Sequence, residues 1–168
     1  IKPALFSIFE RACHLAQGTG VGEIPGVMSA YNSLFERLWL NKSVIEVEGS
    51  KMSVDTRNLS AGYKSAFRDY IVFHDWEETT TQLFKTVVKE GDVVVDCGGN
   101  MGYFTLLAAK LVGETGRVYT FEPAPQNFNL LVKNIELNGY KNITPYQKAV
   151  SNTSGTVKLY ICDEDIGN

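Results

Sequence analysis

Apolar residues recur along the chain with two periods that predict different local structures. Steps of three and four residues near the start predict amphipathic helices over about 1–17 and 29–40, joined by a glycine-rich loop. We expect the second helix to pack on the rest of the protein, although a partner surface or a lid would show the same pattern. Alternation of Val or Ile with Glu over 44–55 predicts a β-hairpin. A polar linker and a helix over 76–89 follow.

From Asp92 onward short apolar runs alternate with helical patterns. This alternation predicts right-handed crossovers and a parallel sheet, and hence an α/β fold. The expected elements are a strand over Val93–Asp96, a helix over 102–112 capped by Gly113, a strand over Arg117–Glu122, a helix over Pro123–Asn138, a strand over Ile143–Val150 and a further strand over Thr156–Cys162.

The run Val93-Val94-Val95 is typical of a strand that is buried on both faces, and we expect it to be central in the sheet. With only the elements predicted here, one edge of that strand stays bare and apolar surface faces water. A bare strand edge invites pairing with another chain. We therefore expect either that the chain is a truncated product or that a second copy covers this edge, which would make it a homo-oligomer.

The composition excludes several classes of function. With a net charge of −3 the chain has no excess of positive charge to bind the phosphates of a nucleic acid, so we expect no nucleic-acid partner. No apolar run approaches the roughly 18–20 residues that cross a bilayer, so no membrane span is expected. The cysteines Cys13, Cys97 and Cys162 form no CxxC pair, which favours a reduced, cytoplasmic setting. With only two histidines, the sequence predicts no metal site.

The strongest chemical signal is the run Val93–Gly102, in which an apolar strand ends in Asp96 and a glycine-rich turn leads into a helix. Ligands of open α/β sheets bind beyond the carboxyl ends of the strands, where glycines let the backbone approach closely. A dinucleotide fingerprint needs glycines at relative positions 1, 3 and 6, and neither Gly98 nor Gly99 starts such a register. Asp96 would also repel a pyrophosphate, whereas it suits the positive charge of S-adenosylmethionine. A nicotinamide dehydrogenase is therefore disfavoured.

Glu122 ends the next predicted strand, 24 residues after Gly98. An acid about 20 residues beyond a glycine loop can accept hydrogen bonds from ribose hydroxyls. Pro123 and Pro125 then fix the turn before the following helix.

These motifs resemble those of FkbM-type methyltransferases. The resemblance covers roughly residues 44–168 and rests on three motifs in order: Val94–Thr105; Phe121-Glu122-Pro123 with Asn127, Leu130, Asn134 and Leu137-Asn138; and Ala149–Asn152 with Gly155.

The resemblance implies a Rossmann-like methyltransferase that uses S-adenosylmethionine, typically for O-methylation of a small-molecule or glycan hydroxyl. It divides the chain into a helical extension (1–43), a hairpin with its linker (44–75) and a partial methyltransferase domain (76–168), truncated after the third core strand. Because the family fold has further strands, no general base can be assigned, and a non-catalytic cofactor-binding module is the alternative. The residues it implies around the cofactor are Asp96, Gly98, Gly99, Asn100, Gly102 and Tyr103 near the methionine part, Glu122 and Pro123 at the ribose, and Lys148 and Ala149 near the adenine.

Four further residues have weaker claims. His74 and Asp75 precede the helix that feeds the glycine loop, and they could contact ligand or serve as surface and capping groups. Cys97 is expected to be a small residue fitted to a tight turn rather than a nucleophile. His14 is expected to face solvent.

Overall fold

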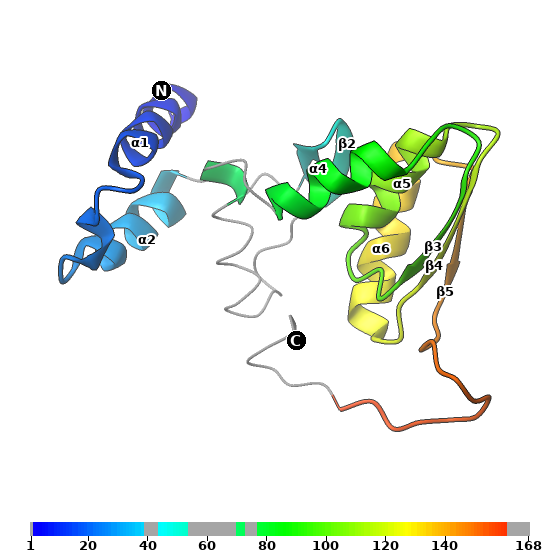
Figure 1. Ribbon diagram of the computed structural model, residues 1–168. Coiled ribbons are helices and arrows are strands. Elements are labelled where there is room, and N and C mark those ends of the chain that lie inside the picture. Colours follow the sequence, from blue (N-terminus) through cyan, green and yellow to red (C-terminus); the bar gives the residue numbers. More distant parts are fainter. Residues whose placement is uncertain (1, 39–43, 54–69, 73–76, 161–168) are drawn as a thin grey trace. The chain divides into compact units, whose positions relative to one another are not determined.

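The computed structural model describes residues 2–38, 44–53, 70–72 and 77–160. It divides into two compact units (Figure 1). One contains the two N-terminal helices, and the other contains the hairpin and the α/β alternation. The hairpin therefore belongs to the same unit as the parallel sheet, whereas the sequence had grouped it with the linker.

The N-terminal unit is built on two helices, α1 (Lys2–Ala16) and α2 (Val27–Leu38), with a 3-10 turn at Val21–Glu23 between them. Their apolar faces pack on each other through aromatic rings. Phe9 stacks on Tyr31 with ring centroids 5.5 Å apart, and Phe6 meets Phe35 edge-on at 6.1 Å. Both predicted helices are thus present.

The hairpin consists of β1 (Val44–Val47) and β2 (Ser50–Ser53), which pair antiparallel. It packs on helix α6 (Pro125–Asn138). The side chain of Asn138 accepts the Lys51 N–H and donates to the Lys51 carbonyl, each at 2.7 Å. Asn138 therefore pairs with the edge of β2 much as a neighbouring strand would, and the predicted hairpin is confirmed with a docking partner on α6.

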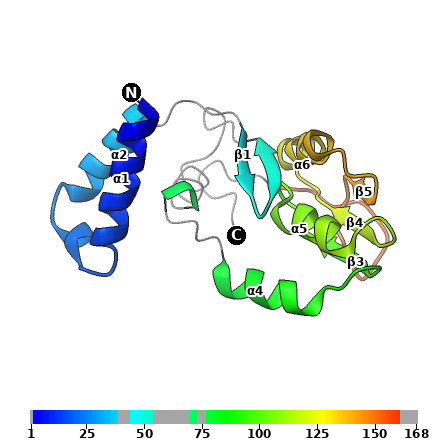
Figure 2. The same cartoon turned by 90° about the horizontal axis from the view of Figure 1, so that it is seen from above.

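The remaining elements alternate as the sequence predicts. They are α4 (Glu78–Val87), β3 (Val93–Cys97), α5 (Tyr103–Val112), β4 (Arg117–Phe121), α6 and β5 (Ile143–Tyr146). The three strands pair in parallel in the order β3-β4-β5. Figures 1 and 2 show α5 and α6 on the same face of this sheet. The chain has the α/β fold with a parallel sheet that the pattern predicted, and the arrangement agrees with the Rossmann-like fold that the resemblance implied.

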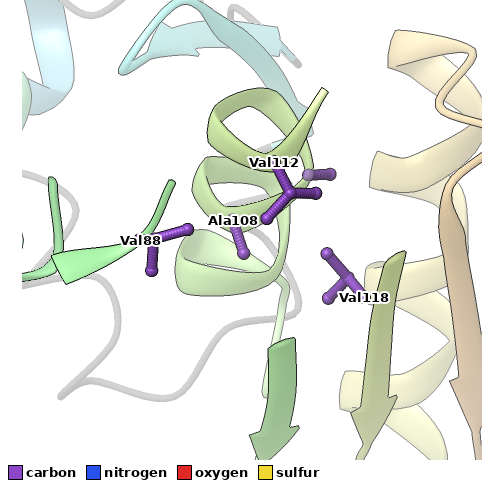
Figure 3. Packing of buried hydrophobic residues seen from close by; sticks show 5 residues of the cluster. Val88, Ala108, Val112 and Val118 are labelled. Atoms are coloured by element: carbon purple, nitrogen blue, oxygen red, sulfur yellow. The ribbon is translucent and has the colours of Figure 1, made fainter. Parts of the chain in front are cut away.

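The core of this unit lies between α5 and the sheet (Figure 3). Val88, Ala108, Val112 and Val118 each have 8% or less of their surface exposed, and they pack as one apolar cluster. The alanine side chain lets α5 approach the strands closely, and burying the three valines stabilises the unit by roughly 1.5–3 kcal/mol each. This packing fixes the start of α5, and with it the loop that joins β3 to α5.

The opposite face of the sheet is uncovered in the part of the chain that the structure describes. Val93 and Val95 on this face are 65% and 58% exposed, although Val94 between them packs into the core. β3 also stands at the end of the described sheet, with a strand neighbour on one side only. The expectation that this valine strand leaves a bare edge and exposed apolar surface is confirmed for the described residues. The central place with both faces buried, which the valine run predicted, is not found among the described residues, because β3 pairs with β4 alone and one of its faces is exposed.

Three predicted boundaries are wrong. β5 ends at Tyr146 rather than at Val150, because the Lys148 N–H turns back to the Tyr146 carbonyl at 2.9 Å. α6 begins at Pro125 rather than at Pro123, since the residue before a proline favours extended backbone, and Ala124 adopts it. Residues 156–160 form no strand, although their alternation predicted one, and the last two residues of that prediction lie outside the described part.

A candidate cofactor-binding site at the carboxyl ends of the strands

The loop between β3 and α5 is held against the end of the neighbouring strand. The N–H groups of Gly98 and Gly99 both donate to the Phe121 carbonyl, at 2.8 and 3.0 Å. Gly98 has a φ of 92°, a backbone conformation that favours glycine. A Cβ placed on Gly98 would meet no atom within 4 Å, so this side of the loop is open to a ligand.

Gly99 is required for a different reason. A Cβ at this position would lie 2.1 Å from Oγ1 of Thr120 and 3.2 Å from Oγ1 of Thr105. Both threonines are fully buried, so neither can move aside into solvent. The loop therefore rests directly on two hydroxyl groups below it.

The second half of the loop is tied to groups outside it. The Asn100 N–H donates to Oε2 of Glu122, and Nδ2 of Asn134 donates to the Met101 carbonyl, each at 2.8 Å. Gly102, with a φ of 103°, is the N-cap of α5. Because each bond fixes a backbone group, the loop is shaped by the protein before any ligand arrives.

Asp96 lies at the end of β3 and is partly buried. Burial raises the pKa of its carboxyl group above the ordinary aspartate value, and the hydrogen bond from Thr105 opposes this rise. The Thr105 hydroxyl donates to Oδ2 at 2.5 Å, whereas Oδ1 accepts no hydrogen bond from the described residues. A cation placed near Oδ1 would favour the ionised carboxylate, so the site prefers positive charge.

Glu122 follows β4 and is 5% exposed. Its two oxygens accept different backbone groups: Oε1 the Ala124 N–H and Oε2 the Asn100 N–H, both at 2.8 Å. A carboxylate has about four acceptor positions, so two stay available for other donors. This acid therefore joins the glycine loop to the start of α6 and can still receive hydroxyl groups.

The structure brings six of the sequence-predicted site residues together at one end of the sheet: Asp96, Gly98, Gly99, Asn100, Gly102 and Glu122. Pro123 lies in the turn directly after them. Tyr103 is instead engaged by α4, because its hydroxyl lies 2.9 Å from that of Thr81 and only 9% of the residue is exposed. Burial raises the pKa of this tyrosine.

Lys148 and Ala149 lie exposed beyond β5, with the Lys148 ammonium 5.9 Å from the centre of the Tyr146 ring. Cys97 and His14 are also exposed. His74 and Asp75 lie outside the described residues. Across the described ranges, no group of three or more His, Cys, Asp or Glu side chains is placed to hold a metal ion. None of the described helices has the length and apolarity that crossing a membrane requires.

Sequence reasoning gave no site role to three residues that shape this site, Thr105, Thr120 and Asn134, although the first and the last lie in the motifs that carry the resemblance. The first two are fully buried hydroxyls beneath the loop, and the third bridges the loop to β2, since its Oδ1 accepts the Ser53 N–H at 2.7 Å. Thr105 and Thr120 look like ordinary helix and strand residues in the sequence. Their common signal is polarity at positions where the helix and strand patterns call for an apolar side chain.

Comparison with known proteins agrees with this geometry. The parallel sheet, the glycine loop after β3 and the acids at the carboxyl ends of two adjacent strands fit a Rossmann-like, S-adenosylmethionine-dependent methyltransferase, and the family match gives the same class. Residues 68–159 match the family model of the TRM5/TYW2 methyltransferase domain. The chain belongs to this family. The match corrects the family expected from the motifs, because it supports a methyltransferase but not FkbM membership specifically.

Individual relatives match about a third of the chain. The protein-L-isoaspartate O-methyltransferase of Methanococcoides burtonii is 39% identical over 57 residues, which cover 34% of this chain and 28% of that protein. A cobalt-precorrin-6B C(15)-methyltransferase of Saccharolobus solfataricus is 40% identical over 60 residues, 36% of this chain and 30% of that protein. The chain thus spans less than a third of the length of these curated relatives.

Among solved structures, M. jannaschii TYW2 in complex with S-adenosylmethionine is 25% identical, with a TM-score of 0.45. That alignment covers 61% of this chain and 41% of the solved chain.

Proposed function

We propose that this chain binds S-adenosylmethionine through the Asp96–Gly102 loop and Glu122, as part of an O-methyltransferase for small-molecule or glycan hydroxyls. The observation that carries the proposal is the pair of carboxylates after adjacent strands, one on each side of the glycine loop. Asp96 would receive the charged methionine end, and Glu122 would receive the ribose hydroxyls. The open face of Gly98 leaves room for the ligand between them.

Charge separates this ligand from a dinucleotide. Two carboxylates near the loop repel a pyrophosphate, and one of them has its pKa raised by burial, so it gains from a cation. The loop N–H groups that bind phosphates in dinucleotide folds have other partners here: those of Gly98 and Gly99 donate to the Phe121 carbonyl, and that of Asn100 donates to Glu122.

Oxygen as the methylated atom is supported by the isoaspartate relatives, which are, by name, O-methyltransferases. The net charge of −3 gives no general attraction for nucleic acid, which favours a small-molecule or glycan acceptor.

The chemistry needs few groups from the protein. The bound cofactor supplies an already activated methyl group, so the enzyme mainly aligns the acceptor and excludes water. The residues described here account for holding the cofactor, because the loop and both acids are fixed by backbone hydrogen bonds, by Thr105 and by Asn134.

Cofactor binding is tested by calorimetric titration of S-adenosylhomocysteine into this chain. We expect Glu122→Gln and Asp96→Asn to weaken binding by about ten- to hundredfold each, since each change removes a charged hydrogen-bond acceptor. Glu136→Gln is a matched control, because Glu136 is exposed on α6. Equal affinity of all four proteins would refute the placement of the site.

Methyl transfer is tested by incubating the chain with S-adenosylmethionine labelled in the methyl group and pools of hydroxylated small molecules, glycans or RNA. Label in an ether of a small molecule or glycan supports the proposal. Label in RNA contradicts the acceptor class. Binding without any transfer favours the non-catalytic alternative.

A further inference from the structure

Three polar side chains form a continuous chain beneath the glycine loop. Oγ1 of Thr105 lies 2.5 Å from Oδ2 of Asp96 and 3.0 Å from Oγ1 of Thr120. Both threonines have no exposed surface. They come from two different elements, α5 and β4, which pack against each other.

Thr105 is the middle member of this chain. The Thr105 hydroxyl carries a single hydrogen, and an ionised carboxylate can only accept. In the structure the Thr105 hydroxyl is the donor toward both Oδ2 of Asp96 and Oγ1 of Thr120, so these two oxygens share its one hydrogen, and the contact with Asp96 is the shorter. Thr120 therefore contacts the Thr105 hydroxyl from the core side, and Thr105 alone bonds the carboxylate.

We propose that Thr105 and Thr120 are positioning residues for Asp96, which tie Oδ2 to the core and leave Oδ1 as the oxygen that meets a ligand. The inference deepens the proposed cofactor site and takes its functional meaning from it. Gly99 belongs to the same arrangement, because a Cβ at this position would lie only 2.1 Å from Oγ1 of Thr120 and would push that oxygen aside. The glycine therefore leaves room for the two hydroxyl groups beneath the loop.

No other side chain of the described residues competes for this carboxylate. The ionisable groups on the elements around it have other hydrogen-bond partners: Asp92 accepts from Lys89, Lys110 and Arg117 donate to carbonyl groups, and Glu122 accepts two backbone N–H groups. The pKa of Asp96 is raised by burial and lowered by Thr105 alone.

The test compares two substitutions at each threonine that separate shape from chemistry. Thr105→Val keeps the volume and removes the hydroxyl, whereas Thr105→Ser keeps the hydroxyl and removes a methyl group; Thr120→Val and Thr120→Ser repeat the comparison. The Asp96 carboxyl pKa is followed in each protein by carbon-13 NMR. Titration of S-adenosylhomocysteine gives the affinity, and urea unfolding shows that each variant is folded.

A positioning role predicts that Thr105→Val raises the Asp96 pKa further, because it removes the hydrogen bond to Oδ2. Thr120→Val should change this pKa less, because Thr120 has no direct bond to the carboxylate, and both serine variants should stay close to the parent. Affinity for S-adenosylhomocysteine should fall about tenfold or more in Thr105→Val and be restored in Thr105→Ser. A packing role predicts the opposite order, with the serine variants more affected, and would overturn the inference. An unchanged pKa in Thr105→Val would overturn it too.

The two proposals fail in different ways. If the parent binds no S-adenosylhomocysteine while the valine and serine variants still separate by pKa, the cofactor assignment is wrong and the hydroxyl chain stands. If the parent binds tightly and all four variants leave the Asp96 pKa unchanged, the cofactor site stands and the hydroxyl chain is refuted.

Discussion

The adjacent glycines of the loop offer a direct test, because they are required for different physical reasons. Gly98 has a φ of 92°, and a Cβ added there would meet only open space, so alanine at this position strains only the backbone. Gly99 is not among the residues with positive φ, so alanine is acceptable to its backbone. Its added Cβ would instead meet Oγ1 of Thr120 at 2.1 Å.

Because of this contact, Gly99→Ala should lower the free energy of unfolding more than Gly98→Ala does. Thr120 would have to retreat by about 1.3 Å to reach the 3.4 Å of ordinary contact, and it is fully buried. Overpacking of this kind costs about 1–3 kcal/mol, and losing the hydrogen bond to Thr105 adds about 1 kcal/mol. We expect Gly99→Ala to lower the free energy of unfolding by about 3 kcal/mol. Gly98→Ala should cost about 1–2 kcal/mol, because it forces an L side chain into left-handed backbone.

Urea unfolding in two backgrounds separates these causes. In a Thr120→Ala background the atom that Gly99→Ala would strike is gone, so the cost of that change should fall by at least about 1 kcal/mol. The cost of Gly98→Ala should be the same in both backgrounds. The reasoning is refuted if Gly99→Ala costs as much with Thr120→Ala as without it, or if Gly98→Ala is the more damaging change.

Three other variants test separate parts of the structure. Because burial raises the pKa of Asp96, ionisation of this group opposes folding, and Asp96→Asn should be more stable than the parent at pH 7. Urea unfolding should show the difference in unfolding free energy between the two proteins shrinking as the pH falls through the raised pKa toward the ordinary value of about 3.9. Asn138→Ala removes both bonds to Lys51 and should cost about 1–2 kcal/mol, with faster hydrogen exchange at the Lys51 amide; unchanged exchange would contradict the docking of the hairpin. Tyr103→Phe removes the hydrogen bond between Tyr103 and Thr81 and should lower the free energy of unfolding by about 1 kcal/mol while leaving the affinity for S-adenosylhomocysteine unchanged. A large loss of affinity would instead indicate that this tyrosine contacts the cofactor.

The parts of the fold that sequence could predict are those in which local pattern and tertiary structure agree. The apolar stripe of α5 has a period that matches its burial in the core cluster, and the valine run of β3 marks a strand although only Val94 of this run packs against that cluster. Glycine at position 102 marks the start of α5 because its φ of 103° favours this residue. The position of Glu122 could be predicted as well, because it follows the loop by one helix and one strand.

The rest depended on contacts between distant segments. Residues 156–160 pair with no strand among the described residues, so a strand-like pattern forms no strand. Tyr103 was placed in the pocket by its position after the loop, but the hydroxyl of Thr81 on α4 engages it. Thr105 and Thr120 are 15 residues apart, and their hydroxyls meet only because α5 packs on β4.

A crystal structure of this chain grown with equal concentrations of S-adenosylhomocysteine and NAD tests the central claim most directly. We predict density for S-adenosylhomocysteine, with its ribose hydroxyls in hydrogen-bond distance of Glu122 and its amino group on the Oδ1 side of Asp96. A pyrophosphate seated beside Asp96 would contradict the account.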